Sequence, residues 1–228
     1  MPLVHKYKQS RDYRWKAGET LPGDTKPAPT STSDGACYGI SVFWIRENAA
    51  GRDFFQWLGA SQVAILAAPP DSTNWQDHSS KAGPMVAHVK EAMQQQSMAI
   101  KDLDNHMGDL AKGELAIRLV TEASPLKAIK DEDGLLKSFL PKDPGKWVGE
   151  LKAEPGFKFI SFSGYSGLVK EDMNHAITVL VDPAGCKLFD PNIGEFHAAD
   201  LGELLNDIVA VMKFYDIRLN RAYFVTFR

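Results

Sequence analysis

Short runs in the second half of the chain alternate apolar and polar residues, which is the pattern of half-buried β-strands. Two runs, FKFISFS at 157–163 and HAITVLV at 175–181, are also rich in the β-branched and aromatic residues that favour strands. The turn sequence Asp182–Gly185 follows the second run and precedes an apolar run at 186–189, so 175–189 is predicted to be a β-hairpin. Further short strands are expected at 195–197 and 222–227.

The first half instead places apolar residues three and four positions apart, which is the spacing of one face of an α-helix. Prolines interrupt 122–156, and this stretch predicts no long element. Helices followed by mostly antiparallel strands predict an α+β fold. The predicted helices cover 36–48, 53–66, 85–100, 104–121 and, among the strands, 201–212.

Residues 1–33 are predicted to be an N-terminal arm and flexible linker ahead of a folded domain at 34–228. Residues 5–16 mix basic and aromatic side chains, which could contact a membrane or acidic partners; a solvated terminal segment is the favoured interpretation. Residues 17–33 are rich in Gly, Pro, Ser and Thr, which is typical of a linker. Ser33 or Asp34 is expected to cap the first helix.

The composition is that of an ordinary folded protein. The 228 residues are 44% hydrophobic and 24% charged, with a formal net charge of −3, and these values exclude disordered and collagen-like chains. The near-neutral balance argues against nucleic acid as a partner, because general nucleic-acid binding needs clustered Lys and Arg. No apolar run reaches the roughly 18–20 residues of a bilayer span, and the first residues do not resemble a secretory signal peptide.

The two cysteines, Cys37 and Cys186, are too few for a disulfide scaffold. One bridge between them is an alternative, but two unpaired thiols in a reducing compartment is the simpler interpretation. No H-E-x-x-H, C-x-x-C or phosphate-binding glycine loop occurs, so no metal and no cofactor are expected.

Cys37 lies in the first turn of the predicted helix 36–48. The free N–H groups and the dipole at a helix N-terminus favour negative charge, and a cysteine nucleophile acts as its thiolate. Gly35 and Ala36 leave room beside the sulfur for a substrate chain. A small buried cysteine without chemistry is the alternative interpretation.

His175 begins one predicted strand and Asp190 ends the next, so the hairpin should bring the two side by side. A carboxylate there can hold the orientation and tautomer of an imidazole, which is the third role of a catalytic triad. Asn192 could do the same work without the charge. The alternatives are an ordinary surface or core histidine, and an aspartate that forms the turn before Pro191.

Two other features are weaker. Gly164–Leu168 approaches the G-x-S-x-G motif of serine hydrolases, but its second glycine comes one position early, and a glycine-rich loop at the rim of the cleft is the preferred interpretation. His197 is close to the predicted site in sequence. An ordinary surface histidine is the favoured interpretation over a residue with a role in the site.

The segments around these three candidate residues are similar to a known family. GACYGISVFWI at 35–45 resembles the nucleophile helix of papain-like cysteine proteases. NHAITVLVD at 174–182 and LFDPNIGEF at 188–196 resemble the histidine and aspartate blocks of the YopT/AvrPphB-type bacterial effector proteases. The order of Cys, His and Asp along the chain matches that family. The tryptophan in the first helix, Trp44, matches too, as does the DPN-GEF continuation, which is DPN at 190–192 followed by GEF at 194–196.

The resemblance implies a papain-like α+β fold, in which a helical subdomain carrying the nucleophile helix packs on a mostly antiparallel sheet. It implies a thiol protease with Cys37 as nucleophile, His175 as general base and acid, and Asp190 as the orienting residue. Family members leave the bacterium through a secretion system without a cleaved signal peptide and act in the cytoplasm of a target cell. The implied partners are a protein substrate in that host or target cell, and a secretion chaperone or inhibitor.

The resemblance is incomplete at the oxyanion site. Papain-like enzymes often place Gln or Asn several residues before the cysteine, and residues 11–35 contain neither. The Cys37 backbone N–H is one donor, and a hydroxyl among residues 31–33 is the candidate second donor. This departure keeps two alternatives open: a transglutaminase, deamidase or acyltransferase with the same three residues, and a binding module without turnover.

Overall fold

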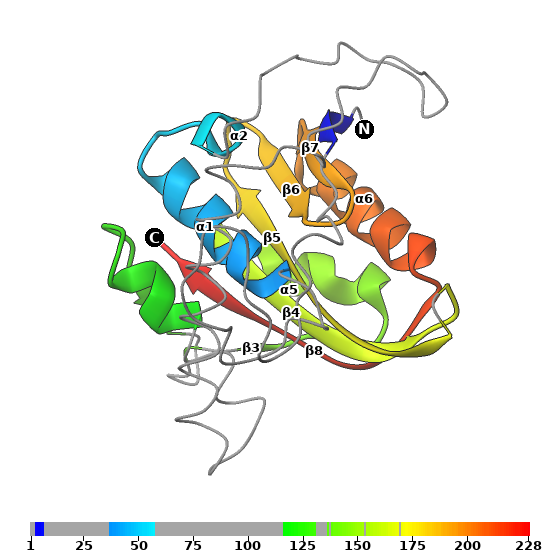
Figure 1. The fold of residues 1–228 in the computed structure, drawn as a ribbon. Helices are drawn as coiled ribbons and strands as arrows, with labels where there is room; N and C mark the ends of the chain where they lie inside the picture. Colours follow the sequence, from blue (N-terminus) through cyan, green and yellow to red (C-terminus); the bar gives the residue numbers. More distant parts are fainter. Residues whose placement is uncertain are drawn as a thin grey trace, which may run out of the picture.

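The computed structural model of the chain describes residues 3–6, 37–57, 116–130, 136, 138–152, 154–168 and 170–228. Within them, an eight-stranded sheet has helices on both faces (Figure 1), so the prediction of an α+β fold is confirmed. The expected helix 85–100, the linker 17–33, the capping residues 33–34 and most of the expected helices 53–66 and 104–121 lie outside the described residues.

The sheet contains β1 (Leu3–Lys6), β2 (Ala128–Ile129), β3 (Ser138–Phe139), β4 (Gly156–Ser166), β5 (Glu171–Val181), β6 (Cys186–Asp190), β7 (Gly194–Ala198) and β8 (Ile217–Phe227). The described helices are α1 (Cys37–Ala49), α2 (Phe54–Trp57), α5 (Trp147–Lys152) and α6 (Leu201–Phe214), with a 3₁₀ turn η2 (Pro144–Lys146). Residues 116–121 are also helical. Among these helices, none has the length and hydropathy needed to cross a bilayer.

The strand order is β1-β7-β6-β5-β4-β8-β2, and β3 also pairs with β8. Every pairing is antiparallel. The central hairpin of β4 and β5 is paired along its whole length, from Gly156 opposite Val181 to Ser166 opposite Glu171. This long hairpin is the platform on which the predicted histidine lies.

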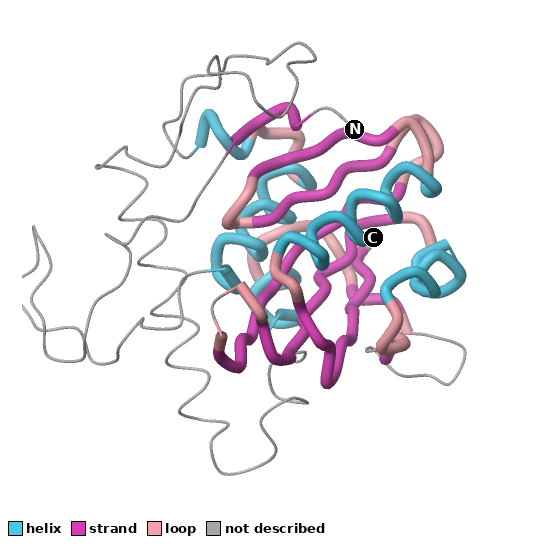
Figure 2. Tube along the Cα trace, turned by 90° about the vertical axis from the view of Figure 1, so that its right-hand side faces the viewer, coloured by secondary structure: helices cyan, strands magenta, loops and turns pink. Residues whose placement is uncertain are grey.

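Alternate residues of the central strands face two separate cores, because successive side chains of a strand point to opposite faces. On β4, Phe159 belongs to the core that contains α1, whereas Ile160 and Phe162 belong to the core that contains α5 and α6. On β5, Ala176 and Ile177 divide in the same way. Helices α1 and α6 therefore cover opposite faces of the sheet, and Figure 2 shows a helix running across the strands on the side nearest the viewer.

The central strands are longer than predicted. Strand β5 begins at Glu171, so His175 lies inside the strand rather than at its predicted start. Strand β4 likewise runs through Gly164 to Ser166. A side chain at Gly164 would collide with the backbone of Arg218, so this glycine permits a close approach of β4 to β8 instead of marking a loop.

The N-terminus differs from the prediction of an arm. Leu3–Lys6 form β1, which pairs with β7 at the edge of the sheet. The His5 ring stacks on Phe55 at a centroid distance of 4.2 Å. The four residues, LVHK, do not alternate apolar and polar side chains, so the sequence carries no strand signal here, and the strand is stabilised by its pairing with β7.

Candidate active site

Cys37 is the first residue of α1, and only 8% of the residue is exposed. The first N–H groups of a helix have no partner within the helix and favour an anion. The Ser41 hydroxyl donates to the Ala176 carbonyl oxygen at 3.2 Å. Because Ala176 follows His175 directly, this bond fixes the helix that carries the thiol against the strand that carries the imidazole.

His175 and Asp190 meet where the pairing between β5 and β6 ends. The ladder joins Thr178–Leu180 to Lys187–Phe189, and both residues lie just beyond it. Their side chains meet instead, with His175 Nε2 3.0 Å from Asp190 Oδ2. This contact confirms the prediction that the hairpin brings His175 and Asp190 side by side. Asp190 is fully buried and His175 is 3% exposed, so water does not weaken the contact.

The Cys37 thiol is close enough to the His175 ring to help raise the pKa of that ring. Since Nε2 is taken by Asp190, Nδ1 is the ring nitrogen left for the sulfur. Burial opposes protonation of the ring, but the charge of Asp190, its hydrogen bond and the contact with Cys37 outweigh it and raise the pKa of His175 to about 10. The structure thus brings the three predicted residues together; their catalytic roles remain a prediction.

Tyr215, the residue that caps the C-terminus of α6, was not among the predicted site residues. Its hydroxyl lies 3.0 Å from Asp190 Oδ1 and 3.2 Å from Oδ2. Asn192 contributes twice: its backbone N–H donates to Asp190 Oδ1 at 2.7 Å, and its amide donates to the Tyr215 hydroxyl at 3.0 Å. Asn192 therefore supports Asp190 rather than replacing it. Neither periodicity nor motif spacing in the sequence indicates Tyr215.

Trp44 anchors the middle of α1 to the sheet. Its ring is fully buried and stacks parallel to Phe189 at a centroid distance of 5.8 Å. Its indole N–H donates to Glu195 Oε2 at 2.6 Å. Phe189 precedes Asp190 on β6 and Glu195 lies on β7, so these contacts hold α1 against these two strands. The sequence contained a signal in the DPN-GEF continuation, whose Glu195 is this acceptor.

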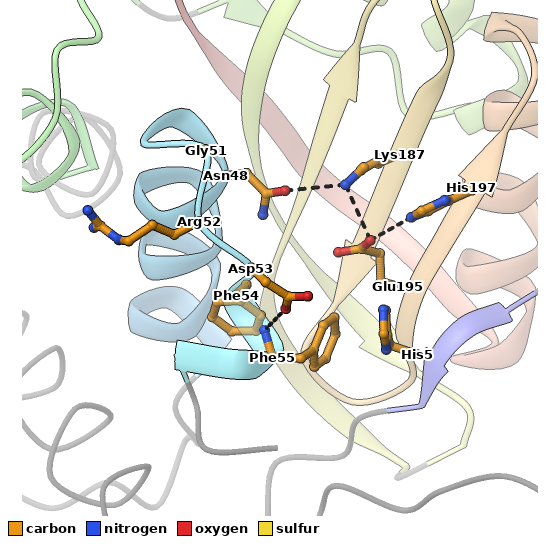
Figure 3. A pocket seen from close by; sticks show the side chains of 10 residues that line it. All are labelled: His5, Asn48, Gly51, Arg52, Asp53, Phe54, Phe55, Lys187, Glu195 and His197. Atoms are coloured by element: carbon orange, nitrogen blue, oxygen red, sulfur yellow. Dashed lines mark hydrogen bonds and ion pairs between the residues drawn. The ribbon is translucent and has the colours of Figure 1, made fainter. Parts of the chain in front are cut away.

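Glu195 is at the centre of a polar cluster that lines a pocket of about 420 Å³ (Figure 3). The carboxylate contacts His197 at 2.6 Å and Lys187 at 3.6 Å, and Lys187 donates to Asn48 at 3.3 Å. His5, from β1, lines the same pocket. Asn48 lies at the opposite end of α1 from Cys37, so the pocket is separate from the predicted triad.

Substitution of Glu195 tests this anchor. Burial opposes its ionisation, but the hydrogen bond from His197, the charge of Lys187 and the hydrogen bond from Trp44 lower its pKa below 4.5. A carboxylate whose pKa is lowered on folding stabilises the fold when the pH is above its ordinary pKa. That stabilisation is lost as the pH falls through the folded-state pKa. Glu195→Gln should therefore lower the free energy of unfolding by about 1.5–3 kcal/mol at neutral pH, and the difference should shrink at an acidic pH below the folded-state pKa of the carboxyl.

Urea unfolding at the two pH values measures the difference. Glu150→Gln, on an exposed position of α5, is the matched control and should change little. Equal stability of wild type and Glu195→Gln at neutral pH would show that the carboxylate does not anchor α1.

Two weaker sequence features have structural explanations. His197 bonds to Glu195 and lines the pocket around that carboxylate, so it is separate from the predicted triad. Ser166, the serine of the near-match to G-x-S-x-G, ends β4 and donates to the Tyr215 carbonyl at 2.7 Å; it is a structural group. Both cysteines are free and buried. Within the described ranges, no group of three or more His, Cys, Asp or Glu is arranged to hold a metal.

No family model matches the sequence, and no curated protein matches it. Among solved structures, the chain is similar to the crystal structure of the Pseudomonas avirulence protein AvrPphB, with 14% identity, a TM-score of 0.53, and coverage of 86% of this chain and 93% of that chain. At this identity the likeness is one of fold. The protein therefore shares its fold with a bacterial avirulence protein. The family that the sequence motifs resemble is named in part after that protein.

Proposed function

We propose that this protein is a papain-like cysteine protease of the YopT/AvrPphB type, which cleaves a protein of a host or target cell. The observation that carries the proposal is the hydrogen bond between the His175 ring and the buried Asp190 carboxylate, beside a Cys37 thiol that helps to raise the pKa of the ring. A cysteine at a helix N-terminus, next to an imidazole that a carboxylate orients, is the arrangement that nucleophilic thiol catalysis needs.

The reaction uses each of the three groups at a stated atom. The Cys37 sulfur, as thiolate, attacks the carbonyl carbon of the scissile peptide, while the proton resides on His175. That proton passes to the leaving amine as the C–N bond breaks, and a thioester remains on Cys37. Water then gives a proton to His175 and attacks the thioester carbon, the C–S bond breaks to release the carboxylic acid product, and the thiolate remains beside the protonated His175. Asp190 accepts from Nε2–H throughout, so Nδ1 stays directed toward the sulfur.

The oxyanion of the tetrahedral intermediate needs hydrogen-bond donors. The Cys37 backbone N–H, at the start of α1, is one of them. A hydroxyl among residues 31–33, which lie outside the described part of the chain, is proposed as the second. The proposed setting is export by a bacterial secretion system without a cleaved signal peptide and action in the target-cell cytoplasm, with a secretion chaperone or inhibitor as a further partner.

The test is to add the protein to a lysate of candidate host cells and to label newly formed protein N-termini for mass spectrometry. New termini should form with the untreated protein and be absent after its thiols are blocked with iodoacetamide. Glutamine residues that gain about one dalton without chain cleavage would instead support a deamidase with the same three residues. The proposal would be contradicted if neither cleavage nor modification occurred in lysates in which a control thiol protease is active.

A further inference from the structure

Four hydrogen-bonding groups converge on the Asp190 carboxylate or on the hydroxyl that contacts it. His175 Nε2 and the backbone N–H of Asn192 each bond to a different carboxylate oxygen, and the Tyr215 hydroxyl lies within 3.2 Å of both. The Asn192 amide donates to that hydroxyl at 3.0 Å. These groups come from β5, the turn after β6 and the end of α6, so three separate parts of the fold meet at one carboxylate.

The chemistry of the groups sets the direction of each bond. An amide nitrogen can only donate, so the Tyr215 oxygen accepts from Asn192. A carboxylate can only accept, so the one hydroxyl proton of Tyr215 goes to Asp190. The hydroxyl also lies 3.3 Å from His175 Nε2, but the N–H there is directed to Asp190 at the shorter distance of 3.0 Å. The chain of bonds therefore runs from Asn192 through Tyr215 to Asp190.

Tyr215 itself is held firmly. The residue is 4% exposed, and its ring lies against the His175 ring at a centroid distance of 5.1 Å. Its carbonyl oxygen accepts from Ser166 Oγ at 2.7 Å and from the Leu168 N–H at 3.4 Å. Because the backbone and ring of Tyr215 are fixed, its hydroxyl can hold the Asp190 carboxylate in one rotamer.

We infer that Tyr215 is a positioning residue for the predicted triad, whose hydroxyl locks the Asp190 carboxylate so that His175 presents Nδ1 to Cys37. The inference rests on the proposed function for its consequence in catalysis, but the orientation of the ring can be measured without a substrate. Removal of the hydroxyl leaves the buried carboxylate with one donor fewer and frees it to rotate. Misplacement of a catalytic group by about 1 Å can cost about 10²-fold in rate, so a loosened His175 should cost about 10-fold.

The experiment compares wild type, Tyr215→Phe and Tyr165→Phe. The second substitution removes a hydroxyl from an exposed tyrosine at the end of β4 and is the matched control. Two quantities are measured on each full-length protein: the rate of Cys37 alkylation by iodoacetamide across pH, resolved from Cys186 by mass spectrometry, and the ring nitrogen chemical shifts of His175. Circular dichroism confirms the fold of each variant.

Tyr215→Phe should slow Cys37 alkylation near pH 6 by about 10-fold, move the pH profile toward that of Cys186, and change the His175 ring shifts; Tyr165→Phe should change none of these. Asn192→Ala, which removes the donor to the hydroxyl, should act in the same direction and keeps the inference testable if Tyr215→Phe does not fold. Wild-type alkylation together with wild-type ring shifts in Tyr215→Phe would overturn the inference. If Cys37 of the wild type reacts no differently from Cys186, the proposed function fails, and the ring shifts alone decide the role of Tyr215.

Discussion

The Cys37→Ala variant is expected to fold and to lose at least about 10⁴-fold of the proteolytic rate, because it lacks the sulfur that forms the covalent intermediate. The substitution removes a single sulfur from a site that retains its backbone N–H and its helix. Activity is measured as the rate at which new N-termini form in a lysate, and the fold is checked by the urea midpoint.

Cys186→Ala is the matched control for this substitution. Cys186 is also free and buried, at 3% exposure, but it begins β6 at the end opposite to Asp190. Its substitution should lower stability to a similar small extent and leave the proteolytic rate unchanged. A Cys37→Ala variant that retains activity within 10-fold of wild type would exclude thiol catalysis at this site.

The Asp190→Asn variant is expected to lower the rate by about 10⁴-fold while the fold is retained. Asparagine has the same shape, but it lacks the charge that helps to raise the pKa of His175, and its amide can stabilise the wrong imidazole tautomer. The pKa of His175, followed by NMR, should fall from about 10 toward 6.5 in the variant. A variant with near wild-type activity and an unchanged His175 titration would show that Asp190 neither charges nor orients the ring.

The same substitution changes how stability depends on pH. A histidine whose folded-state pKa is raised contributes stability that is complete below its ordinary value of 6.5 and is lost as the pH rises through about 10. The free energy of unfolding of the wild type should therefore decline more than that of Asp190→Asn between those two values. Urea unfolding at several pH values measures the difference, and parallel curves would contradict it.

Local sequence signals predicted the elements that carry the triad. Helix α1 begins at Cys37, one residue from the predicted start, and the hairpin of β5 and β6 has its turn at the predicted position. The approach of His175 to Asp190 follows from that hairpin, because a tight turn determines which residues of two strands face each other. The contact between this hairpin and Cys37 rested on the family resemblance, since no local pattern determines how a distant helix packs.

The features missed by the sequence analysis depend on tertiary contacts. Strand β1 is stabilised by its pairing with the edge of β7, and its residues LVHK show no alternation of apolar and polar side chains. Tyr215 reaches Asp190 from the end of a helix that lies on the opposite face of the sheet from α1. Glu195 was visible in a motif, but its role as acceptor for Trp44 depends on the packing of α1 over β6 and β7. Such contacts combine elements far apart in sequence, and no window of residues contains them.

The most direct test of the account is the alkylation of Cys37 by iodoacetamide as a function of pH, with Cys186 as the internal reference. Burial raises the pKa of the Cys186 thiol above 9.0, so its reaction should require alkaline conditions. We expect Cys37 to react well below pH 7, and His175→Ala to abolish this difference between the two thiols. Two thiols with the same pH profile in the wild type, or a Cys37 profile unaffected by His175→Ala, would contradict an activated cysteine–histidine pair.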